Sequence, residues 1–305
     1  MKAVRFNEYG GPEVLKILDV DKPTPHADEV LVKVKAAGIN PGEAGIRGGF
    51  LHDRFPAHFP EGEGSDFAGI VEEVGAGVSD FASGDEVIGY SNARSSHAEF
   101  VAVDASQLTP KPANVSWEQA GALFVAGATA YAEVNAIVAK PGETVVVSAA
   151  TGGVSVIAIQ LLTRNGAKVI GLASAKHHDW LEQHGAIGVD YGDGVADRIR
   201  DVAGGNVDAF LDNFGDGYIE LALELGVPKD RINSIADFPG VQKHGVKSEG
   251  SAAGTSNIVL AELAQLIAKG ELEIPIAASY PLSEVRSAYE ELEKRHTRGK
   301  IVLIP

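Results

Sequence analysis

Cysteine is absent from this sequence, and other features that would indicate particular classes of protein are missing too. Without cysteine there are no disulfides, no thiolate nucleophiles and no Cys-based zinc or iron–sulfur sites. No run of about eighteen apolar residues is present to span a bilayer, and the N-terminal residues lack the apolar core of a secretion signal. These absences predict a protein of the reducing cytoplasm with no membrane partner.

Basic side chains are also scarce. The 26 Lys and Arg residues stand against 42 Asp and Glu, and the formal net charge is -16. Nucleic-acid binding draws much of its affinity from Lys and Arg that neutralise phosphates, so a nucleic-acid partner is not expected. An anionic ligand would have to be held locally, by a helix N-terminus or by one or two well-placed cations.

Two domains are expected from a chain of 305 residues of which 45% are hydrophobic. Residues 1–112 consist of short β-branched runs separated by Gly, Pro and Asp, which predicts a β-rich domain. From Trp117 onward, strand-like runs alternate with Ala-rich helical ones, which predicts a parallel sheet with helices on both faces. Residues 275–305 contain a charged helix and a final apolar strand that can return to complete the first domain.

The most informative segment is VVVSAATGGVSVIAIQLLTRNG, where a strand is expected to end at residues 148–149 and a helix to begin near Gly153. Small residues let the backbone approach a pyrophosphate, and the unpaired N–H groups of the helix point at the anion. The glycines of the Gly-x-Gly-x-x-Gly fingerprint fall here on Ala150, Gly152 and Ser155. Because two of these three are not glycine, an ordinary Gly-rich turn is the alternative interpretation.

The next strand, KVIGLAS, predicts which dinucleotide would bind. NAD-binding sites carry a carboxylate for the ribose 2′-hydroxyl at this strand's end, but this chain has Ser174 and Lys176 there. A hydroxyl and an ammonium bind a 2′-phosphate that a carboxylate would repel, so NADPH is the predicted cofactor. Tyr191, after the third strand, can add a hydroxyl. The alternative is that Lys176 is only a solvated residue of a first helical turn.

Motifs over nearly the whole chain resemble one family. They are AAGINPGEAGIRGG, FPEGEGSDFAGIVEEVGAGVSDFASGDEVIGY, SHAEFVAV, AGATAYAEVNAIVAKPGETVVVSAATGGVS, HGAIGVDYGDG, DAFLDNFGD and RGKIVLIP. Together they resemble the medium-chain dehydrogenase/reductase superfamily, in its zinc-free NADPH:quinone oxidoreductase branch that includes zeta-crystallin. The resemblance implies an α/β protein with a GroES-like β-rich catalytic domain, residues 1–120 and 275–305. It further implies a Rossmann NADPH-binding domain with a doubly wound parallel sheet, residues 121–274, an active site in the cleft and a homodimer.

The resemblance also implies roles for particular residues of this sequence. Asn40 matches the polar residue beside the nicotinamide and the substrate carbonyl, and it is the catalytic candidate, although it can instead cap a turn before Pro41. The positions that match cofactor contacts are Thr129, Ala150, Gly152, Gly153, Val154, Ser174, Lys176, Tyr191, Asn213, Phe214, Gly299 and Lys300.

The sequence departs from the family in three places. Ser155 replaces the last glycine of the loop, which either shifts the helix from the sheet or adds a hydroxyl to the phosphate cradle. Gly45 stands where some quinone reductases have Tyr, so a phenol donor is lost from that position. After DAFLDNFGD the chain reads LELGVPKDRINSIADFPG, where the family usually has a Gly-Gly turn.

The expected activity is hydride transfer from NADPH to a quinone or a related conjugated carbonyl compound. The zinc ligands of the alcohol dehydrogenases are missing, which disfavours alcohol oxidation, and no metal is predicted. Three aromatic residues, Phe50, Phe55 and Phe59, can line the site of a flat substrate or serve only in packing. The alternatives are a reductase of enoyl thioesters or alkenals, and an NADPH-binding structural or regulatory protein without turnover.

Overall fold

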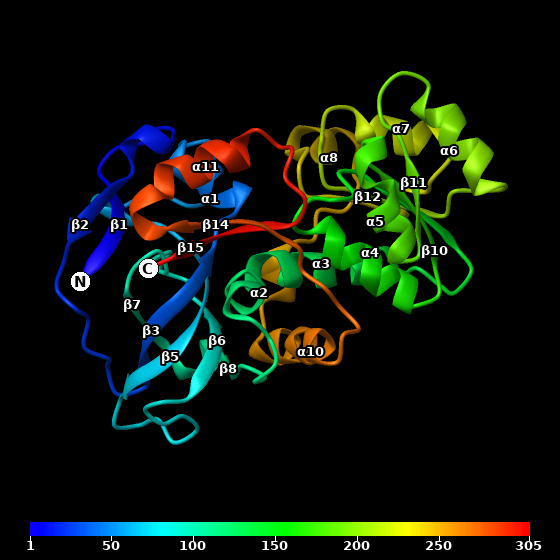
Figure 1. The fold of residues 1–305 in the computed structure, drawn as a ribbon. Helices are drawn as coiled ribbons and strands as arrows, with labels where there is room; N and C mark the ends of the chain where they lie inside the picture. Colours follow the sequence, from blue (N-terminus) through cyan, green and yellow to red (C-terminus); the bar gives the residue numbers. More distant parts are fainter. The chain divides into compact units, whose positions relative to one another are not determined.

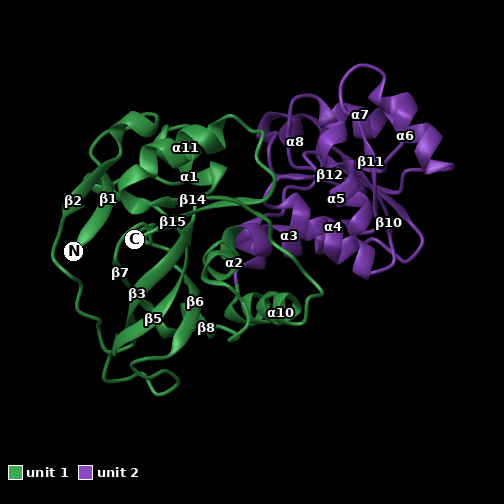
Figure 2. Cartoon of the chain, viewed as in Figure 1, with its two compact units in different colours: residues 1–125, 256–305 green, residues 126–255 purple.

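The computed structural model describes residues 1–305, which fall into two compact units. Unit 1 consists of residues 1–125 and 256–305, and unit 2 of residues 126–255 (Figure 2). The chain therefore leaves unit 1, builds unit 2 and then returns. Helix α10 (Asn257–Ala268) belongs to unit 1, whereas the sequence-based boundary at residue 275 placed it in the second domain.

Unit 1 is rich in β-structure. A three-stranded sheet has the order β2-β1-β4, and a seven-stranded sheet has the order β14-β15-β3-β5-β6-β8 with β7 also paired to β3. The strands are β1 (Lys2–Phe6), β2 (Lys16–Asp19), β3 (Glu29–Gly38), β4 (Glu61–Gly62), β5 (Asp66–Val74), β6 (Glu86–Tyr90), β7 (Phe100–Asp104), β8 (Leu108–Pro110), β14 (Ile276–Pro281) and β15 (Lys300–Ile304). The helices are α1 (Pro41–Arg47), α2 (Trp117–Gly121), α10 and α11 (Val285–Glu293).

Strand β3 joins the two ends of the sequence within unit 1. It pairs antiparallel with β5 and β7, and near its carboxyl end with β15 through Leu303 opposite Ala37. Figure 1 shows the last strand lying beside β3, although almost the whole chain separates them. Alternating apolar side chains such as Val30, Val32 and Val34 are buried in the core of this sheet.

Unit 2 alternates strands and helices, as the sequence predicted. Its strands are β9 (Thr144–Val147), β10 (Lys168–Leu172), β11 (Ala186–Val189), β12 (Ala209–Asp212) and β13 (Ile232–Ser234). Its helices are α3 (Phe124–Ile137), whose first two residues lie in unit 1, α4 (Ser155–Arg164), α5 (His178–Gln183), α6 (Val195–Ala203), α7 (Tyr218–Glu224), α8 (Phe238–His244) and α9 (Ser251–Gly254). None of the helices in either unit is long and apolar enough to cross a membrane.

The five strands of unit 2 are parallel and follow the order β11-β10-β9-β12-β13. This is the Rossmann order, and it confirms the predicted fold class. Beyond β13 the sheet continues only as one parallel bridge between Asn233 and Lys247. Apolar strand residues such as Val146, Ile170 and Phe210 are fully buried, as expected for strands covered on both faces.

Candidate functional site

The bend between β9 and α4 has the geometry of an anion cradle. Ala149 adopts the left-handed conformation, with φ of 45°, and the Gly152 N–H donates to the Ala149 carbonyl over 2.8 Å. Helix α4 begins at Ser155, and no side chain caps its start. The Val156 and Ile157 N–H groups already donate to the Gly152 and Val154 carbonyls, so the N–H groups left for an anion are those of residues 153–155, where the helix dipole also favours negative charge. The predicted contacts at 150–154 all lie in this bend.

The Ser155 hydroxyl is held by protein groups. Its side chain is 1% exposed, and Oγ donates to the Ser148 carbonyl over 3.2 Å while it accepts from Asn213 Nδ2 over 2.9 Å. The serine that replaces the family glycine therefore ties the start of α4 to β9 and to the turn after β12. It does not offer its hydroxyl to the phosphate cradle.

Two neighbouring strands bring together the residues predicted to hold a 2′-phosphate. In the parallel pair β10–β11, Leu172 lies opposite Val189, so Ser174 and Tyr191 each follow by two residues at the same edge of the sheet. Lys176 follows Ser174 by two residues and is exposed. No carboxylate ends β10, so the side chains at that strand end suit a 2′-phosphate.

Arg198 fixes the loop that carries Tyr191. Its guanidinium donates to four consecutive backbone carbonyls, those of residues 190–193, over 2.7 to 3.3 Å. A planar fork with five donors suits such a cluster of carbonyls. This role could not be predicted from the sequence, because the bonds go to backbone atoms and not to a recognisable partner side chain.

The turn after β12 is held by a buried carboxylate. Asp212 is 0% exposed and accepts from the hydroxyls of Ser148 and Ser234 and from the N–H groups of Phe214 and Gly215. Asn213 points its carboxamide into the protein, where Nδ2 donates to Ser155 and to Glu133. Phe214 is 37% exposed, and so it is the predicted contact in this turn that presents its side chain outward.

Helix α3 carries the predicted contact Thr129 and, one turn later, the acid Glu133. Thr129 is 6% exposed and Glu133 is fully buried. Residues four apart share a helix face, so Thr129 and Glu133 lie on the same side of α3. On that side Glu133 Oε1 accepts from Asn213 Nδ2 over 3.1 Å. Burial raises the pKa of Glu133 to about 8, Asn213 opposes this shift, and the nearby Asp212 charge adds to it.

Asn40 and Lys300, predicted from opposite ends of the sequence, meet in unit 1. The Lys300 ammonium donates to Asn40 Oδ1 and to the Ile39 carbonyl, the latter over 2.9 Å. Asn40 Nδ2 donates to Asp66 over 3.1 Å, and Lys300 lies 3.4 Å from the same carboxylate. Asn40, Lys300 and Asp66 are each no more than 4% exposed. Burial raises the pKa of Asp66 to about 6, although the Lys300 charge opposes the shift.

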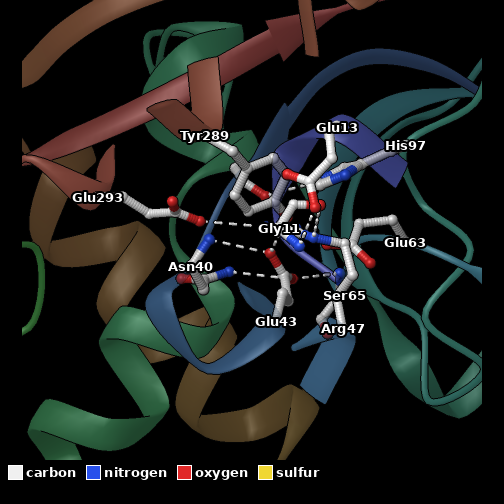
Figure 3. Close-up of polar contacts among 11 residues, drawn as sticks. Gly11, Glu13, Asn40, Glu43, Arg47, Glu63, Ser65, His97, Tyr289 and Glu293 are labelled. Carbon is white, nitrogen blue, oxygen red and sulfur yellow. Dashed lines mark hydrogen bonds and ion pairs between the residues drawn. The ribbon is translucent and has the colours of Figure 1, made fainter. Parts of the chain in front are cut away.

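Glu43 links this group to helix α11 (Figure 3). One carboxylate oxygen accepts from the Asn40 N–H over 2.9 Å and from the Tyr289 hydroxyl over 2.9 Å. The other accepts from Asn40 Nδ2 and from the Ser65 N–H. Asn40 precedes α1 and Glu43 is the third residue of that helix, so Glu43 bonds back to the helix start as in a capping box. Asn40 is therefore also the N-cap residue of α1, which is the alternative role that its place before Pro41 suggested.

An ion pair lies beside Glu43 in the same interior. Arg47 is 0% exposed, donates to Glu63 over 2.6 Å and lies over the Tyr289 ring at 4.4 Å (Figure 3). Burial raises the pKa of Glu63, and the Arg47 charge opposes this shift. His97 is also fully buried; burial lowers its pKa, so the ring is neutral and Nε2 donates to the Gly38 carbonyl over 3.1 Å.

Gly299 and the aromatic residues of unit 1 have structural constraints of their own. Gly299 has φ of 80°, and a Cβ there would lie 1.9 Å from the Pro275 carbonyl oxygen. Phe59 packs edge-on against Phe6 and Tyr9, whereas Phe50 is 88% exposed. Phe59 thus serves in packing, whereas the Phe50 side chain is mostly exposed.

Sequence reasoning missed the buried charges around these residues: Glu43, Arg47, Glu63, Asp66, Glu133 and Asp212. Two of these residues could have been recognised from the sequence. Glu43 stands three residues after Asn40, as in a capping box, and Glu133 interrupts the apolar helix sequence AGATAYAEVNAIVA. No group of three or more His, Cys, Asp or Glu side chains has the arrangement of a metal site.

Comparisons with known proteins match both units. Residues 26–134 match the family model described as alcohol dehydrogenase GroES-like domain, and residues 184–303 match the one described as zinc-binding dehydrogenase. A quinone oxidoreductase of Rattus norvegicus is 33% identical over 319 residues, covering 99% of this chain and 96% of that protein.

Solved structures agree with these matches. The quinone oxidoreductase of Coxiella burnetii has a TM-score of 0.90 at 31% identity, covering 100% of this chain and 99% of that one. The quinone oxidoreductase of Escherichia coli, solved in complex with NADPH, has a TM-score of 0.88 at 30% identity, covering 100% of both chains.

A GroES-like unit made from both ends of the sequence and a Rossmann-type unit between those segments define a class of two-domain oxidoreductases. The chain belongs to the medium-chain dehydrogenase/reductase superfamily, in its quinone oxidoreductase branch. The family resemblance predicted from the motifs is thereby confirmed, and the protein is an enzyme of that family.

Proposed function

We propose that this enzyme binds NADPH and reduces a quinone or a related conjugated carbonyl compound. The observation that carries the proposal is the uncapped start of α4 behind the left-handed bend at Ala149. Such a start suits a pyrophosphate, because N–H groups and the helix dipole both favour an anion there. NADPH supplies the hydride when it is bound.

The residues of unit 2 divide the binding of the cofactor among three elements. The bend at 150–154 holds the pyrophosphate through backbone N–H groups. Ser174, Lys176 and Tyr191 hold the 2′-phosphate, with Arg198 keeping the Tyr191 loop in place. Selectivity for NADPH follows, because a 2′-phosphate gains charge-assisted hydrogen bonds that NADH cannot form.

Asn40 is proposed to stand beside the acceptor carbonyl, held in orientation by Lys300, Glu43 and Asp66. The carboxamide gives both of its N–H groups to Glu43 and Asp66, so it would act beside the acceptor oxygen as a fixed dipole and not as a hydrogen-bond donor to that oxygen. A quinone can take its proton from water, so this arrangement requires no strong acid at Asn40.

The test is a turnover assay with the purified chain, NADPH or NADH, and a panel of quinones, alkenals and enoyl thioesters. We expect NADPH to be consumed fastest with quinones and NADH to be used poorly. Preference for enoyl thioesters or alkenals would instead assign the double-bond reductase activity. Saturable NADPH binding without consumption across the panel would contradict both enzymatic assignments.

A further inference from the structure

Two buried acceptor atoms in unit 2 lack a hydrogen-bond donor, and they belong to residues that already touch. They are Glu133 Oε2 and Asn213 Oδ1. The other atoms of the same two groups are joined, because Asn213 Nδ2 donates to Glu133 Oε1 over 3.1 Å. A buried oxygen without a donor is costly, so a pair with two such oxygens requires an explanation.

The orientation of the Asn213 carboxamide is fixed by Ser155. The Ser155 hydroxyl gives its hydrogen to the Ser148 carbonyl, so Oγ can only accept from the carboxamide. The nitrogen of Asn213 must therefore face Ser155, at 2.9 Å, and the oxygen cannot take its place. Rotating the amide would set Oδ1 against Glu133 Oε1 and against Ser155 Oγ, with no hydrogen between either pair of oxygens.

A single proton removes the difficulty. We propose that Glu133 is kept as a neutral carboxylic acid in a closed pair with Asn213, in which the acid hydroxyl donates to Asn213 Oδ1 while Asn213 Nδ2 donates to Glu133 Oε1. Both oxygens then have a donor. Glu133 is a positioning residue that acts through Asn213 on the turn 213–215.

The surroundings of Glu133 favour the neutral form. Its carboxyl is fully buried, Asn213 and Ser155 carry no charge, and the ionisable neighbour is Asp212 on β12, whose negative charge raises the pKa of Glu133 further. The ammonium of Lys247 is committed to the Ala136 carbonyl near the end of α3. Burial raises the pKa of Glu133 to about 8, in agreement with a protonated side chain at neutral pH.

The consequence for the cofactor rests on the proposed function. The pair joins α3, which carries Thr129, to the turn that carries Phe214, and both are assigned to NADPH. Ionisation of Glu133 would place a carboxylate against Asn213 Oδ1 and against the Asp212 charge, and the turn 213–215 would lose its fixed position. NADPH binding should therefore weaken as the pH rises through the pKa of Glu133.

Two variants separate the acid from its hydrogen bonds. In Glu133→Gln a carboxamide N–H takes the place of the acid hydroxyl, so the pair is kept but cannot ionise. In Glu133→Leu the pair is lost. Glu182→Gln removes an exposed carboxylate elsewhere in unit 2 and controls for the change in net charge.

The first measurements need no cofactor. Infrared spectra near neutral pH should show a protonated carboxyl band that Glu133→Gln lacks and Glu182→Gln keeps. The folded state holds a proton that the unfolded chain releases above a pKa of 4.5, so the free energy of unfolding of the wild type should fall between about pH 5 and about pH 8. Glu133→Gln should lose that part of the slope. An unchanged spectrum or an unchanged slope in Glu133→Gln would overturn the pair.

The second measurement is the dissociation constant of NADPH against pH. We expect it to rise about fivefold from about pH 7 to about pH 9 in the wild type and to stay level in Glu133→Gln, as for the loss of one hydrogen bond. A wild-type affinity for NADPH in Glu133→Leu would overturn the positioning role. If no variant binds NADPH, the proposed function fails, while the spectra and the unfolding slopes still decide the pair.

Discussion

Asn40 and Asn213 show how a carboxamide serves in a crowded polar interior. Each has one oxygen and two N–H donors, and each is in contact with a buried carboxyl, Glu43 for Asn40 and Glu133 for Asn213. Asn40 also accepts from an ammonium, whereas the Asn213 oxygen has no donor unless its neighbour is protonated. The same side chain is thus used in one unit beside a fixed positive charge and in the other beside a titratable acid.

Lys176 tests the choice of cofactor. Lys176→Ala should weaken NADPH about tenfold or more, the value of a charge-assisted hydrogen bond to phosphate, and should leave NADH nearly unaffected. Dissociation constants for both cofactors, measured by fluorescence titration, check this. Lys229→Ala, an exposed lysine of the same unit, is the matched control. Equal weakening of both cofactors would count against the assignment to the 2′-phosphate.

Arg47 tests the buried ion pair of unit 1. Arg47→Met leaves the Glu63 carboxylate without its partner, and removing one member of a buried pair costs about 3 to 5 kcal/mol of stability. Denaturant unfolding near neutral pH measures the loss. Adding Glu63→Gln to the variant should recover part of it, because the stranded charge is then absent. A single variant as stable as the wild type would show that Arg47 contributes nothing net.

Among the elements, the parallel pair β14–β15 depends on one backbone conformation. Gly299 precedes β15 with φ of 80°, and an added Cβ would overlap the Pro275 carbonyl oxygen. Gly299→Ala should therefore destabilise the protein by about 2 kcal/mol or more, the sum of backbone strain and steric overlap. Unfolding by denaturant gives the value.

Gly84 provides the control for this substitution. It also has a positive φ, 97°, but a Cβ there meets nothing within 4 Å. Gly84→Ala should cost about 1 kcal/mol from strain alone. If the two variants lose the same stability, overlap with Pro275 is not the cause.

The Rossmann sheet and the bend between β9 and α4 were predictable because their signals are local. Each apolar run, each Ala-rich helical segment and the Gly152–Gly153 bend can be recognised within a short stretch of sequence. The network of unit 1 has no such signal. Asn40 meets Asp66 across 26 positions and Lys300 across 260, and only the antiparallel pairing of β15 with β3 brings Lys300 to Asn40. Family resemblance named both residues, but not the bond between them.

For the whole molecule, buried carboxyls determine how stability depends on pH. Burial raises the pKa of Asp66 to about 6 and of Glu133 to about 8. The folded chain then holds protons that the unfolded chain has released, so stability should fall as the pH rises from about 4 to about 8. Denaturation midpoints at a series of pH values measure this.

Salt separates the buried acids from the overall charge of -16. Repulsion among exposed carboxylates also grows as the pH rises, but salt screens it, whereas buried groups are screened much less. The fall in stability should therefore persist at high ionic strength. A stability that rises with pH, or a slope that salt abolishes, would contradict the role of the buried acids.

The return of the chain into unit 1 also governs the order in which the protein can be completed during synthesis. Residues 126–255 leave the ribosome as a continuous stretch and can assemble at once, whereas the first 125 residues must wait for the segment 256–305. Until β15 emerges, β3 near Ala37 has β5 on one side and no strand on the other. Nascent chains are thus exposed to wrong strand pairing at that edge until β15 has emerged.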